Sequence, residues 1–482
     1  MNGDLGTRDL IEELERLGVQ MWADAGRLRF RAPRGVMTPE RLAVVKEHKQ
    51  RLLDHLGGGA VALRTDPAAR HEPFPLTDVQ AAYLLGRGEA FAYGGTSCHA
   101  YFELAFEELD HERLERAWQT LVRRHDMLRA EVHPDGHQRV RPDVPDYRIR
   151  VHEGDPERVR AELSHKRYEP SEWPLFDLRV TRTPGRDLLH VSIDLLTADY
   201  TSVQLLLAEL DQLYSGGGEL APLEVTFRDV VLAERAAREG PAHEADRAWW
   251  LERVDTLPGA PELPLADRAE QSPPRFTRHH ARLGGPAWTA LRAHAAARDL
   301  TPASALLAAF ADVVGSWSRR PAFTLNLTLL NRPPVHPQVG ALVGDFTSVT
   351  LLAVDPDPGA DLAGRAAALQ RRLWTDLDHR GFTGVEVMRE LARRRGAEAA
   401  LMPVVFTSTV GLAGDGEGAL TGAGELVTGV SQTPQVWLDC QVMEYRGGLL
   451  VNWDVRDGVF PDGLVEDMFA AFTTLLDGLA AS

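Results

Sequence analysis

Apolar and polar positions recur along the chain at two different spacings. Residues 19–23 and 27–31 alternate like two short strands around a turn at Asp24-Ala25-Gly26, which predicts a hairpin. Thr38 followed by Pro39 is typical of a helix start, so a helix is expected from there through Leu56. A shorter helix is predicted before the hairpin, where apolar residues recur every three to four positions: Leu10, Ile11, Leu14 and Leu17.

Beyond this small N-terminal region, helical and strand-like patterns alternate through the rest of the chain. Residues 59–73 are rich in Gly, Ala and Pro and are interpreted as a linker after a first domain at 1–58. Two larger lobes are then expected at 74–250 and 251–482, joined near a proline-rich stretch at 257–264. The alternation of helices and strands predicts a layered α/β fold for both lobes.

A polar loop between an apolar run and a helical pattern is the first candidate site. Residues 188–193 are strand-like and residues 203–213 are helix-like, so the loop between them is expected at a sheet edge. It carries Asp194, Asp199 and Ser202, and a helix N-terminus favours carboxylate charge. The plainer interpretation is that two surface carboxylates flank a turn.

A second candidate site lies on two later strands. The apolar strand at 402–408 ends in Thr407 and Ser408. In the strand near residue 439, a period of two places Asp439 on the same face as Gln435, Trp437 and Gln441. If that face meets solvent, Asp439 is an ordinary surface acid. If it lines a cavity, Trp437 supplies an apolar wall that raises the pKa of the carboxyl. The sequence leaves both interpretations open.

Composition excludes several classes of function. The 482 residues carry a net charge of −17, which argues against nucleic-acid binding. Two isolated cysteines, Cys98 and Cys440, cannot form a zinc cluster and are expected as thiols, and no metal is expected. No apolar run approaches the length of a membrane span and no secretory signal is recognisable, so the expected location is the cytoplasm.

The N-terminal region is basic within this acidic chain. Residues 24–51 hold eight Lys or Arg against three Asp or Glu. Arg27, Arg29 and Arg31 on the second predicted strand could attract an acidic peptide, although a solvated surface explains the charge equally well.

Several motifs occur in an order that resembles one family. The loop at 194–202 matches D-x-x-x-x-D-x-x-S, and ordinary condensation domains carry H-H-x-x-x-D-G instead, with Leu195 here at the position of the second His. The other matching motifs are F-P-L-T-D-V-Q-A-A-Y-L-L-G-R at 74–87, R-H-D-M-L-R at 124–129, N-R at 331–332, G-D-F-T-S at 344–348, P-V-V-F-T-S at 403–408, Q-T-P-Q-V-W-L-D at 432–439 and N-W-D at 452–454. The chain thus resembles the heterocyclization domains of nonribosomal peptide synthetases, in the condensation-domain superfamily.

The resemblance implies a fold, a reaction and a set of site residues. The fold is a V-shaped pair of chloramphenicol-acetyltransferase-like α/β lobes with a tunnel between them. An acyl or peptidyl thioester on a donor carrier protein is joined to Cys, or Ser or Thr, on an acceptor carrier. The amide is then cyclodehydrated to a thiazoline or oxazoline. The resemblance assigns the cyclodehydration to Thr407 and Asp439.

The remaining motif residues are expected to be architectural. The proposed role for Arg332 is an ion pair with Asp199 or Asp194, which would lower the pKa of those carboxyls. Residues 124–129 are expected to form structural ion pairs. A bulky Tyr200 is expected to shape one mouth of the tunnel. The full set assigned to the structure of the tunnel is Asp194, Asp199, Ser202, Asn331, Arg332, Gln432 and Ser408.

Residues 10–56 resemble the docking domain typified by the tubulysin synthetases. That resemblance implies a hairpin that receives the C-terminal tail of a preceding subunit. No cofactor is expected to bind this chain itself, because the substrates arrive on the phosphopantetheine of carrier proteins. Since the chain shows no adenylation or carrier motif, it is expected to be free-standing or the start of a larger subunit, with an adenylation domain next. Two rival functions remain: a condensation domain that makes only the amide, and a catalytically silent docking module.

Overall fold

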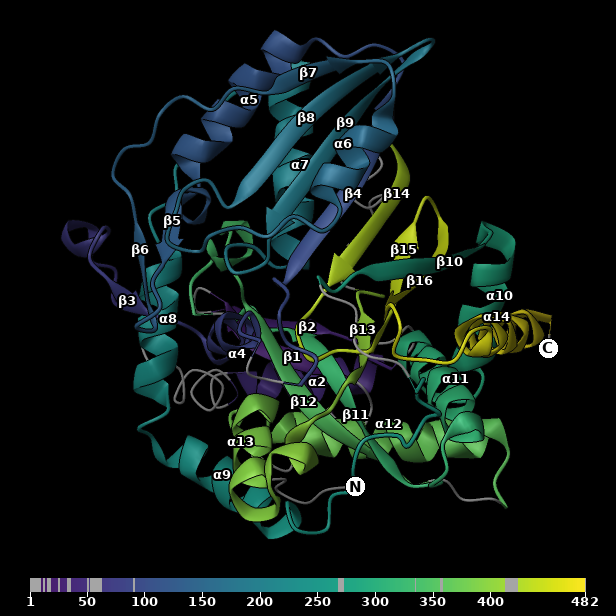
Figure 1. Ribbon diagram of the computed structural model, residues 1–482. Coiled ribbons are helices and arrows are strands. Elements are labelled where there is room, and N and C mark those ends of the chain that lie inside the picture. Colours follow the sequence, from purple (N-terminus) through teal and green to yellow (C-terminus); the bar gives the residue numbers. More distant parts are fainter. Residues whose placement is uncertain are drawn as a thin grey trace. The chain divides into compact units, whose positions relative to one another are not determined.

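The computed structural model describes residues 10–11, 14, 19–24, 27–32, 36–49, 52, 63–89, 92–267, 273–333, 335–355, 359–411 and 424–481, and these fall into two compact units (Figure 1). One unit comprises Met1–Arg70, Leu223–Glu244 and Arg332–Leu342. The other comprises His71–Pro222, Ala245–Asn331 and Val343–Ser482.

The first unit contains the predicted N-terminal hairpin. Strands β1 (Gln20–Asp24) and β2 (Arg27–Arg31) pair antiparallel, and α2 (Pro39–Glu47) starts at Thr38, whose hydroxyl accepts a hydrogen bond from the Arg41 backbone. The short helix predicted before the hairpin is helical at the positions described. Its residues Leu10, Ile11 and Leu14 form one hydrophobic core with Val19, Val45 and Leu52. Leu17, the turn at 25–26 and the end of the second predicted helix at 53–56 lie outside the described residues. The other elements of the unit are η1 (Pro67–Ala69), α8 (Phe227–Ala237) and η3 (Val339–Ala341).

A five-stranded sheet forms one half of the second unit. Its strand order is β14-β4-β9-β8-β7, and β14 comes from the C-terminal part of the chain yet pairs antiparallel with β4 (Figure 1). Helix α6 packs on one face of the sheet, and α5 and α7 pack against each other on the other face. The bounds are β4 (His99–Phe106), β7 (Arg150–Glu153), β8 (Phe176–Thr183), β9 (Arg186–Asp194), β14 (Glu425–Gln432), α5 (His111–Arg124), α6 (Pro156–Leu163) and α7 (Tyr200–Ser215).

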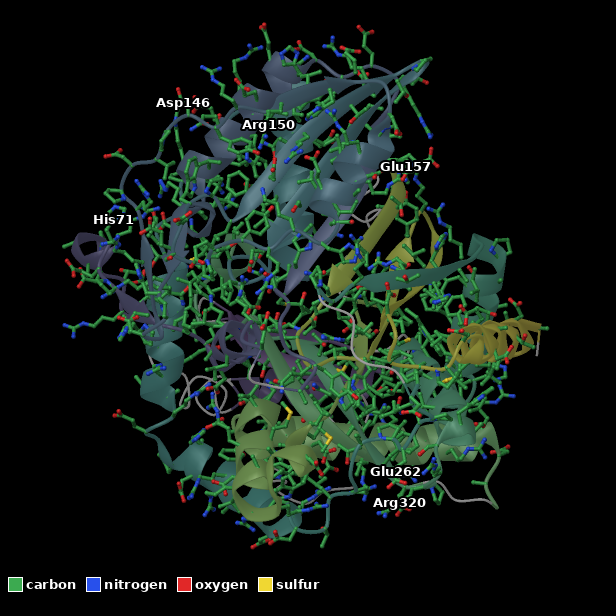
Figure 2. All side chains as sticks on the ribbon, in the orientation of Figure 1. His71, Asp146, Arg150, Glu157, Glu262 and Arg320 are labelled. Carbon is green, nitrogen blue, oxygen red and sulfur yellow. The ribbon has the colours of Figure 1, made fainter. Side chains whose placement is uncertain are left out.

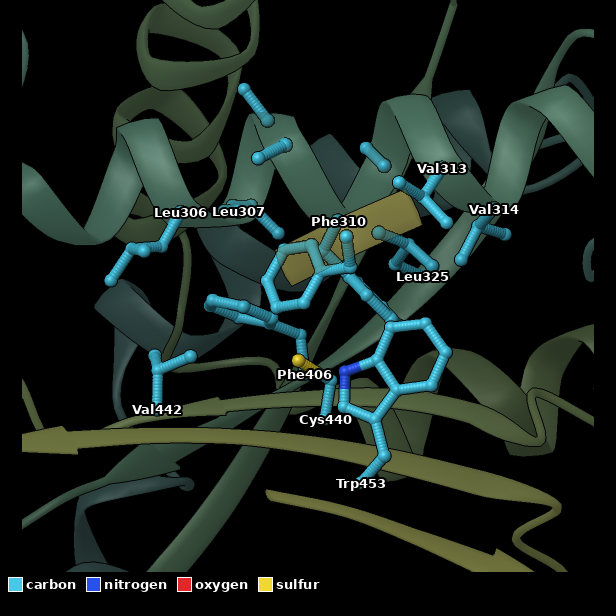
Figure 3. Packing of buried hydrophobic residues seen from close by; sticks show 14 of the residues in the cluster. Leu306, Leu307, Phe310, Val313, Val314, Leu325, Phe406, Cys440, Val442 and Trp453 are labelled. Atoms are coloured by element: carbon cyan, nitrogen blue, oxygen red, sulfur yellow. The ribbon is translucent and has the colours of Figure 1, made fainter. Parts of the chain in front are cut away.

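A six-stranded sheet forms the other half, in the order β10-β16-β15-β13-β11-β12. In the described part of the chain, four helices cover one face, and aromatic rings meet in a core that is otherwise mostly aliphatic: Phe310 on α11 packs against Phe406 and Trp453 of the sheet (Figure 3). The opposite face carries polar side chains on its central strands, whereas Leu351 and Ala353 on β12 join a second hydrophobic cluster there. The bounds are β10 (Phe276–Leu283), β11 (Phe323–Leu330), β12 (Thr347–Val354), β13 (Val404–Ser408), β15 (Leu438–Tyr445), β16 (Gly448–Arg456), α10 (Gly285–Ala296), α11 (Pro302–Trp317), α12 (Leu362–Asp378) and α14 (Leu464–Ala481).

The remaining elements surround these two sheets. The F-P-L-T-D-V-Q-A-A-Y-L-L-G-R motif includes α4, at whose start Thr77 and Gln80 make a capping box. The ion pairs expected at residues 124–129 are also present: Arg124 and His125 contact Glu209, and Arg129 contacts Asp126. The bounds are β3 (Phe74–Pro75), β5 (Ala130–Val132), β6 (His137–Val140), α4 (Asp78–Gly86), η2 (Asp126–Arg129), α9 (Pro241–Arg253), α13 (Gly384–Arg395) and η4 (Ala397–Ala400).

The predicted α/β class is therefore confirmed. Most charged side chains point outward, and pairs such as Arg320 and Glu262, 2.8 Å apart, are solvated and add little stability (Figure 2). Among the described helices, none combines the length and apolar character that a membrane crossing requires.

Candidate active site

A cavity of about 490 Å³ lies within the second unit, against the polar face of the six-stranded sheet. Its other walls come from β4, β14, α4, α7 and α13. Most lining side chains are apolar, and the charged ones among the described residues are Asp199, Arg278, Arg389 and Asp439. No group of three or more His, Cys, Asp or Glu in the described part of the chain is placed to hold a metal ion.

Thr407 and Asp439 meet on the floor of this cavity. Strands β13 and β15 run parallel, and alternation turns these two side chains to the cavity while Phe406 and Cys440 enter the core. The Thr407 Oγ1 lies 3.1 Å from Asp439 Oδ1 and 2.9 Å from the Thr328 hydroxyl. The structure thus brings together both residues that the sequence resemblance assigned to cyclodehydration.

Among the residues that the structure describes, the donors to the Asp439 carboxyl are uncharged. Thr407 donates to Oδ1, and the side-chain amide of Gln441 donates to Oδ2 at 2.7 Å. Removal from bulk water raises the pKa of Asp439 to about 6, although hydrogen bonds from Gln441 and Thr407 oppose that rise. A carboxyl with such a pKa can both accept and donate a proton near neutral pH.

Trp437 does not form the cavity wall that the alternation predicted. Its ring belongs to the hydrophobic core, where it packs edge-on to Tyr93 and Phe460, and Val436 lines the cavity instead. The prediction was wrong because β15 begins only at Leu438, and Gln435 has a φ of 62°. This left-handed turn interrupts the alternation, so Val436 lines the cavity and Trp437 does not, whereas Gln435 lines it as predicted.

Asp194 is sealed away from the cavity. It is fully buried at the end of β9, forms an ion pair with Arg87 at the end of α4, and accepts a hydrogen bond from the Leu196 backbone. The sequence predicted Arg332, not Arg87, as the partner of Asp194. Burial raises the pKa of Asp194 in spite of the Arg87 guanidinium, so the predicted lowering was wrong for this carboxyl. Both carboxylate oxygens are bonded to protein groups and neither is exposed, so Asp194 cannot exchange a proton with a substrate.

Asp199 and Ser202 fix the start of α7. The Asp199 carboxylate caps the helix by accepting from the Ser202 backbone at 2.7 Å, and it also lines the cavity. The Ser202 hydroxyl and the Asp199 backbone both donate to the carbonyl of Gly344, at 2.8 and 3.1 Å. The D-x-x-x-x-D-x-x-S and G-D-F-T-S motifs therefore join at one point.

The other predicted site residues lie around the cavity or away from it. The Asn331 backbone donates to Phe346, and the Ser408 hydroxyl accepts a long bond from Val410. Gln432 is buried, and neither atom of its amide has a hydrogen-bond partner among the described residues. None of these three side chains is among those that line the cavity.

Two predictions about arginines are tested only in part. The Arg332 guanidinium donates to the carbonyls of Val339 and Leu342 at 3.0 and 2.7 Å, and its pairing with Asp199 stays a prediction. The backbone of Arg27, Arg29 and Arg31 forms β2, but their side chains lie outside the described part of the structure.

Sequence reasoning missed three polar residues beside Asp439. Gln441 was placed on the correct face but given no role, and Asp454 was assigned to folding through the N-W-D motif. Arg278 lies on β10, far away in the sequence, and carries no motif. The signal for Gln441 was its period-two relation to Asp439. Pairing with Arg278 appears only once β10 lies beside β16.

Comparisons with known proteins agree with this geometry. Residues 74–482 match the condensation domain family, and residues 8–57 match the TubC N-terminal docking domain. The chain is 46% identical to pyochelin synthetase PchF of Pseudomonas aeruginosa over 492 residues, which covers 98% of this chain and 27% of that protein. It is 40% identical to phenyloxazoline synthase MbtB of Mycobacterium tuberculosis, covering 85% of this chain and 30% of MbtB. The chain thus spans about a quarter to a third of these relatives' length.

A solved structure matches nearly the full length. The EpoB cyclization-docking bidomain from Sorangium cellulosum superposes with a TM-score of 0.87 at 37% identity, covering 98% of this chain and 97% of that one. The condensation domain of the polyketide synthase MokA, at 17% identity and a TM-score of 0.71, shares the fold alone. The chain belongs to the condensation-domain family, in its cyclization type with a TubC-type docking domain ahead of it.

Proposed function

We propose that this chain joins a carrier-bound acyl or peptidyl thioester to carrier-bound Cys, or Ser or Thr, and closes the amide to a thiazoline or oxazoline. The observation that carries the proposal is the Thr407–Asp439 pair, 3.1 Å apart on a cavity wall, with uncharged donors around a carboxyl whose pKa is about 6. Leu195 lines the same cavity at the position where amide-forming relatives carry a histidine, so no imidazole acts from there.

Amide formation is the easier of the two steps. The amine of the acceptor attacks the thioester carbonyl, the C–N bond forms, and the donor pantetheine thiolate leaves. Because an amine is already a good nucleophile toward a thioester, holding both reactants in the cavity supplies most of the acceleration.

Ring closure requires proton transfer because hydroxide is a poor leaving group. The Asp439 carboxylate takes the proton from the attacking thiol as the C–S bond forms, and returns it to the former carbonyl oxygen. The C–O bond then breaks as that hydroxyl receives a second proton, which Asp439 relays from the ring nitrogen as C=N forms. The released water therefore carries the thiol and the amide hydrogens. Thr407 holds Asp439 Oδ1 in place through these transfers.

The partners follow from the same proposal. Donor and acceptor carrier proteins deliver phosphopantetheine thioesters, and an adenylation domain that activates the acceptor amino acid follows in the same subunit. The N-terminal unit receives the tail of a preceding subunit, which is supported by the exposed apolar side chains of Phe30 on β2 and Leu42 on α2. Thiol acceptors are favoured because thiolate is the better nucleophile.

The test is intact-mass analysis of an acceptor carrier charged with Cys, after incubation with an acyl-loaded donor carrier and this protein. Acyl transfer with loss of one water supports the proposal. Transfer without that loss identifies a domain that makes only the amide, and no transfer with a verified carrier pair identifies a silent docking module. Asp439→Asn should accumulate the uncyclized amide, with ring formation reduced about 10²–10⁴-fold. Equal loss of amide and ring would contradict the assigned role.

A further inference from the structure

A row of polar side chains crosses the six-stranded sheet next to Asp439. Asp439 pairs in register with Asp454 on β16, and Asp454 pairs with Arg278 on β10. In the next row, Gln441 pairs with Thr407 on β13, and Thr407 pairs with Thr328 on β11. Because in-register neighbours point to the same face, these two rows form one continuous polar surface.

Gln441 is the centre of this surface. Its amide nitrogen lies 2.7 Å from Asp439 Oδ2, 2.8 Å from the Ser431 hydroxyl and 3.2 Å from Asp454 Oδ2. Its amide oxygen lies 3.1 Å from Arg278 Nη2. Since a guanidinium can only donate, this contact fixes the amide oxygen toward Arg278 and the amide N–H groups toward Asp439.

Arg278 is itself held rigidly. It contacts both oxygens of Asp454, with Nε 2.7 Å from Oδ1 and Nη2 2.5 Å from Oδ2, and Asp454 is only 1% exposed. Such a two-pronged contact fixes the plane of the guanidinium. The Arg278 charge is therefore neutralised by Asp454 on the neighbouring strand, and among the described residues the groups that donate to the Asp439 carboxyl are the uncharged Gln441 amide and Thr407 hydroxyl.

The other half of the unit also contributes to this arrangement. Ser431 lies on β14, in the five-stranded sheet, and its backbone N–H and hydroxyl both donate to Asp454 Oδ2, at 2.9 and 2.6 Å. The amide of Gln441 donates to the same hydroxyl. The orientation of Gln441 thus depends on residues from both sheets.

We infer that Gln441 is a positioning residue for ring closure: clamped by Arg278 and Ser431, it holds Asp439 Oδ2 as Thr407 holds Oδ1, and so fixes the plane of the carboxyl toward the substrate. This inference rests on the proposed function. The charged and titratable groups facing Asp439 are Asp454 on β16, Arg278 on β10 and Tyr83 on α4.

Gln441→Leu tests the inference, because it keeps the volume and removes both halves of the clamp. Loss of the amide donor should move the acidic limb of the ring-closure rate upward by about one pH unit, which lowers the rate about twofold at pH 7, and loss of the fixed carboxyl plane should lower it roughly another fivefold. Amide formation should change less than about threefold. Both rates are measured by intact mass in single turnover between pH 5 and pH 8.

The matched control is Gln370→Leu, another buried glutamine, which accepts from Thr301 and donates to Asp299 on the far side of the sheet from the cavity. It should lower the melting temperature without moving the pH limb. Gln441→Asn, which keeps the amide on a shorter chain, replaces the leucine variant if that protein does not fold, and should give a smaller shift in the same direction.

The outcomes distinguish failure of the proposed function from failure of the positioning role of Gln441. No ring from the unaltered protein overturns the proposed function itself. A ring from the unaltered protein, with both rates of Gln441→Leu falling together and an unmoved pH limb, overturns the positioning role and leaves Gln441 as a structural residue.

Discussion

Two carboxylates in this protein differ in exposure and in surroundings: Asp194 is fully buried, and Asp439 is partly exposed. Asp194 faces a guanidinium, that of Arg87, which also donates to the Ser97 hydroxyl and the Tyr168 carbonyl at 3.0 Å. Asp439 faces a hydroxyl and an amide, and the nearest guanidinium is already occupied by Asp454. The first carboxylate is closed off, whereas the second opens on a cavity.

This difference distinguishes a structural acid from a reactive one. A carboxylate with a direct cation partner, and with no path to a ligand, orients the chain around it. A carboxyl supported only by neutral donors can change its protonation without breaking an ion pair, so it can exchange a proton with a substrate. Both lie in motifs of the family signature, and their neighbours and exposure distinguish them.

The largest expected effect concerns the buried ion pair of Asp194 and Arg87. Arg87→Met leaves Asp194 buried without its cation and should lower the free energy of unfolding by about 3–5 kcal/mol. Urea denaturation measures the change, with Arg320→Met at an exposed ion pair as the control, where the loss should stay below about 1 kcal/mol. The ratio of ring to amide in the folded fraction should not change. A changed ratio would place Asp194 in the chemistry.

At the cavity beside Asp439, Thr407→Val should lower the rate of ring closure and leave the stability of the fold nearly unchanged. Valine keeps the shape but cannot donate to Asp439, so ring closure should slow about 10–100-fold while amide formation continues. Ser408→Ala is the matched control, since that neighbouring hydroxyl does not line the cavity. If the two variants slow ring closure equally, the Thr407 hydroxyl has no special function.

The pH dependence of ring closure should follow Asp439. The carboxylate form accepts the thiol proton, so a pKa of about 6 predicts a rate that falls about tenfold from pH 7 to pH 5. The measurement uses amide already formed on the acceptor carrier, which removes the titration of the attacking amine. A flat profile in this range would exclude Asp439 as the base.

The smallest effect is a gain in stability. Because the pKa of Asp439 is higher in the folded protein than in the unfolded chain, ionisation favours unfolding as pH rises from about 4 to about 6. Asp439→Asn removes this titration and should stabilise the protein by about 1–2 kcal/mol at pH 8, with no gain below pH 4, because partial exposure of the carboxyl reduces the roughly 3 kcal/mol that the full pKa shift would give. Denaturant titrations at both pH values check the sign. An equal change at both would indicate altered packing.

Local patterns predicted the elements, and the motifs predicted that Thr407 and Asp439 belong to one site, whereas long-range contacts were not predicted. The capping box at Thr77, the helix start at Thr38 and the hairpin strands depend on neighbours within a few residues, and the structure contains them. Thr407 and Asp439 were assigned through motifs. The partner of Asp194 is 107 residues away, so no local pattern identifies it.

The error at Trp437 has a different origin. Alternation predicts faces only while the backbone stays extended, and the turn at Gln435 interrupts it. That turn is fixed by distant contacts, because the Gln435 backbone donates to the Tyr93 carbonyl and a Cβ added to Gly86 would lie 2.5 Å from Pro434. Periodicity contains no information about such contacts.

Strand β14 pairs with β4 but is synthesised much later, so β4 is complete long before its neighbour exists. Strand β4 ends at Phe106, and its outer neighbour begins at Glu425, about 320 residues later. At a synthesis rate of about 5–20 residues per second, the β14-side edge of β4 stays unpaired for roughly 15–65 seconds. An unpaired edge can recruit a strand from another chain during that time. The five-stranded sheet is therefore the part of a nascent molecule most exposed to aggregation, and slower translation of residues 107–424 should lower the yield of native protein.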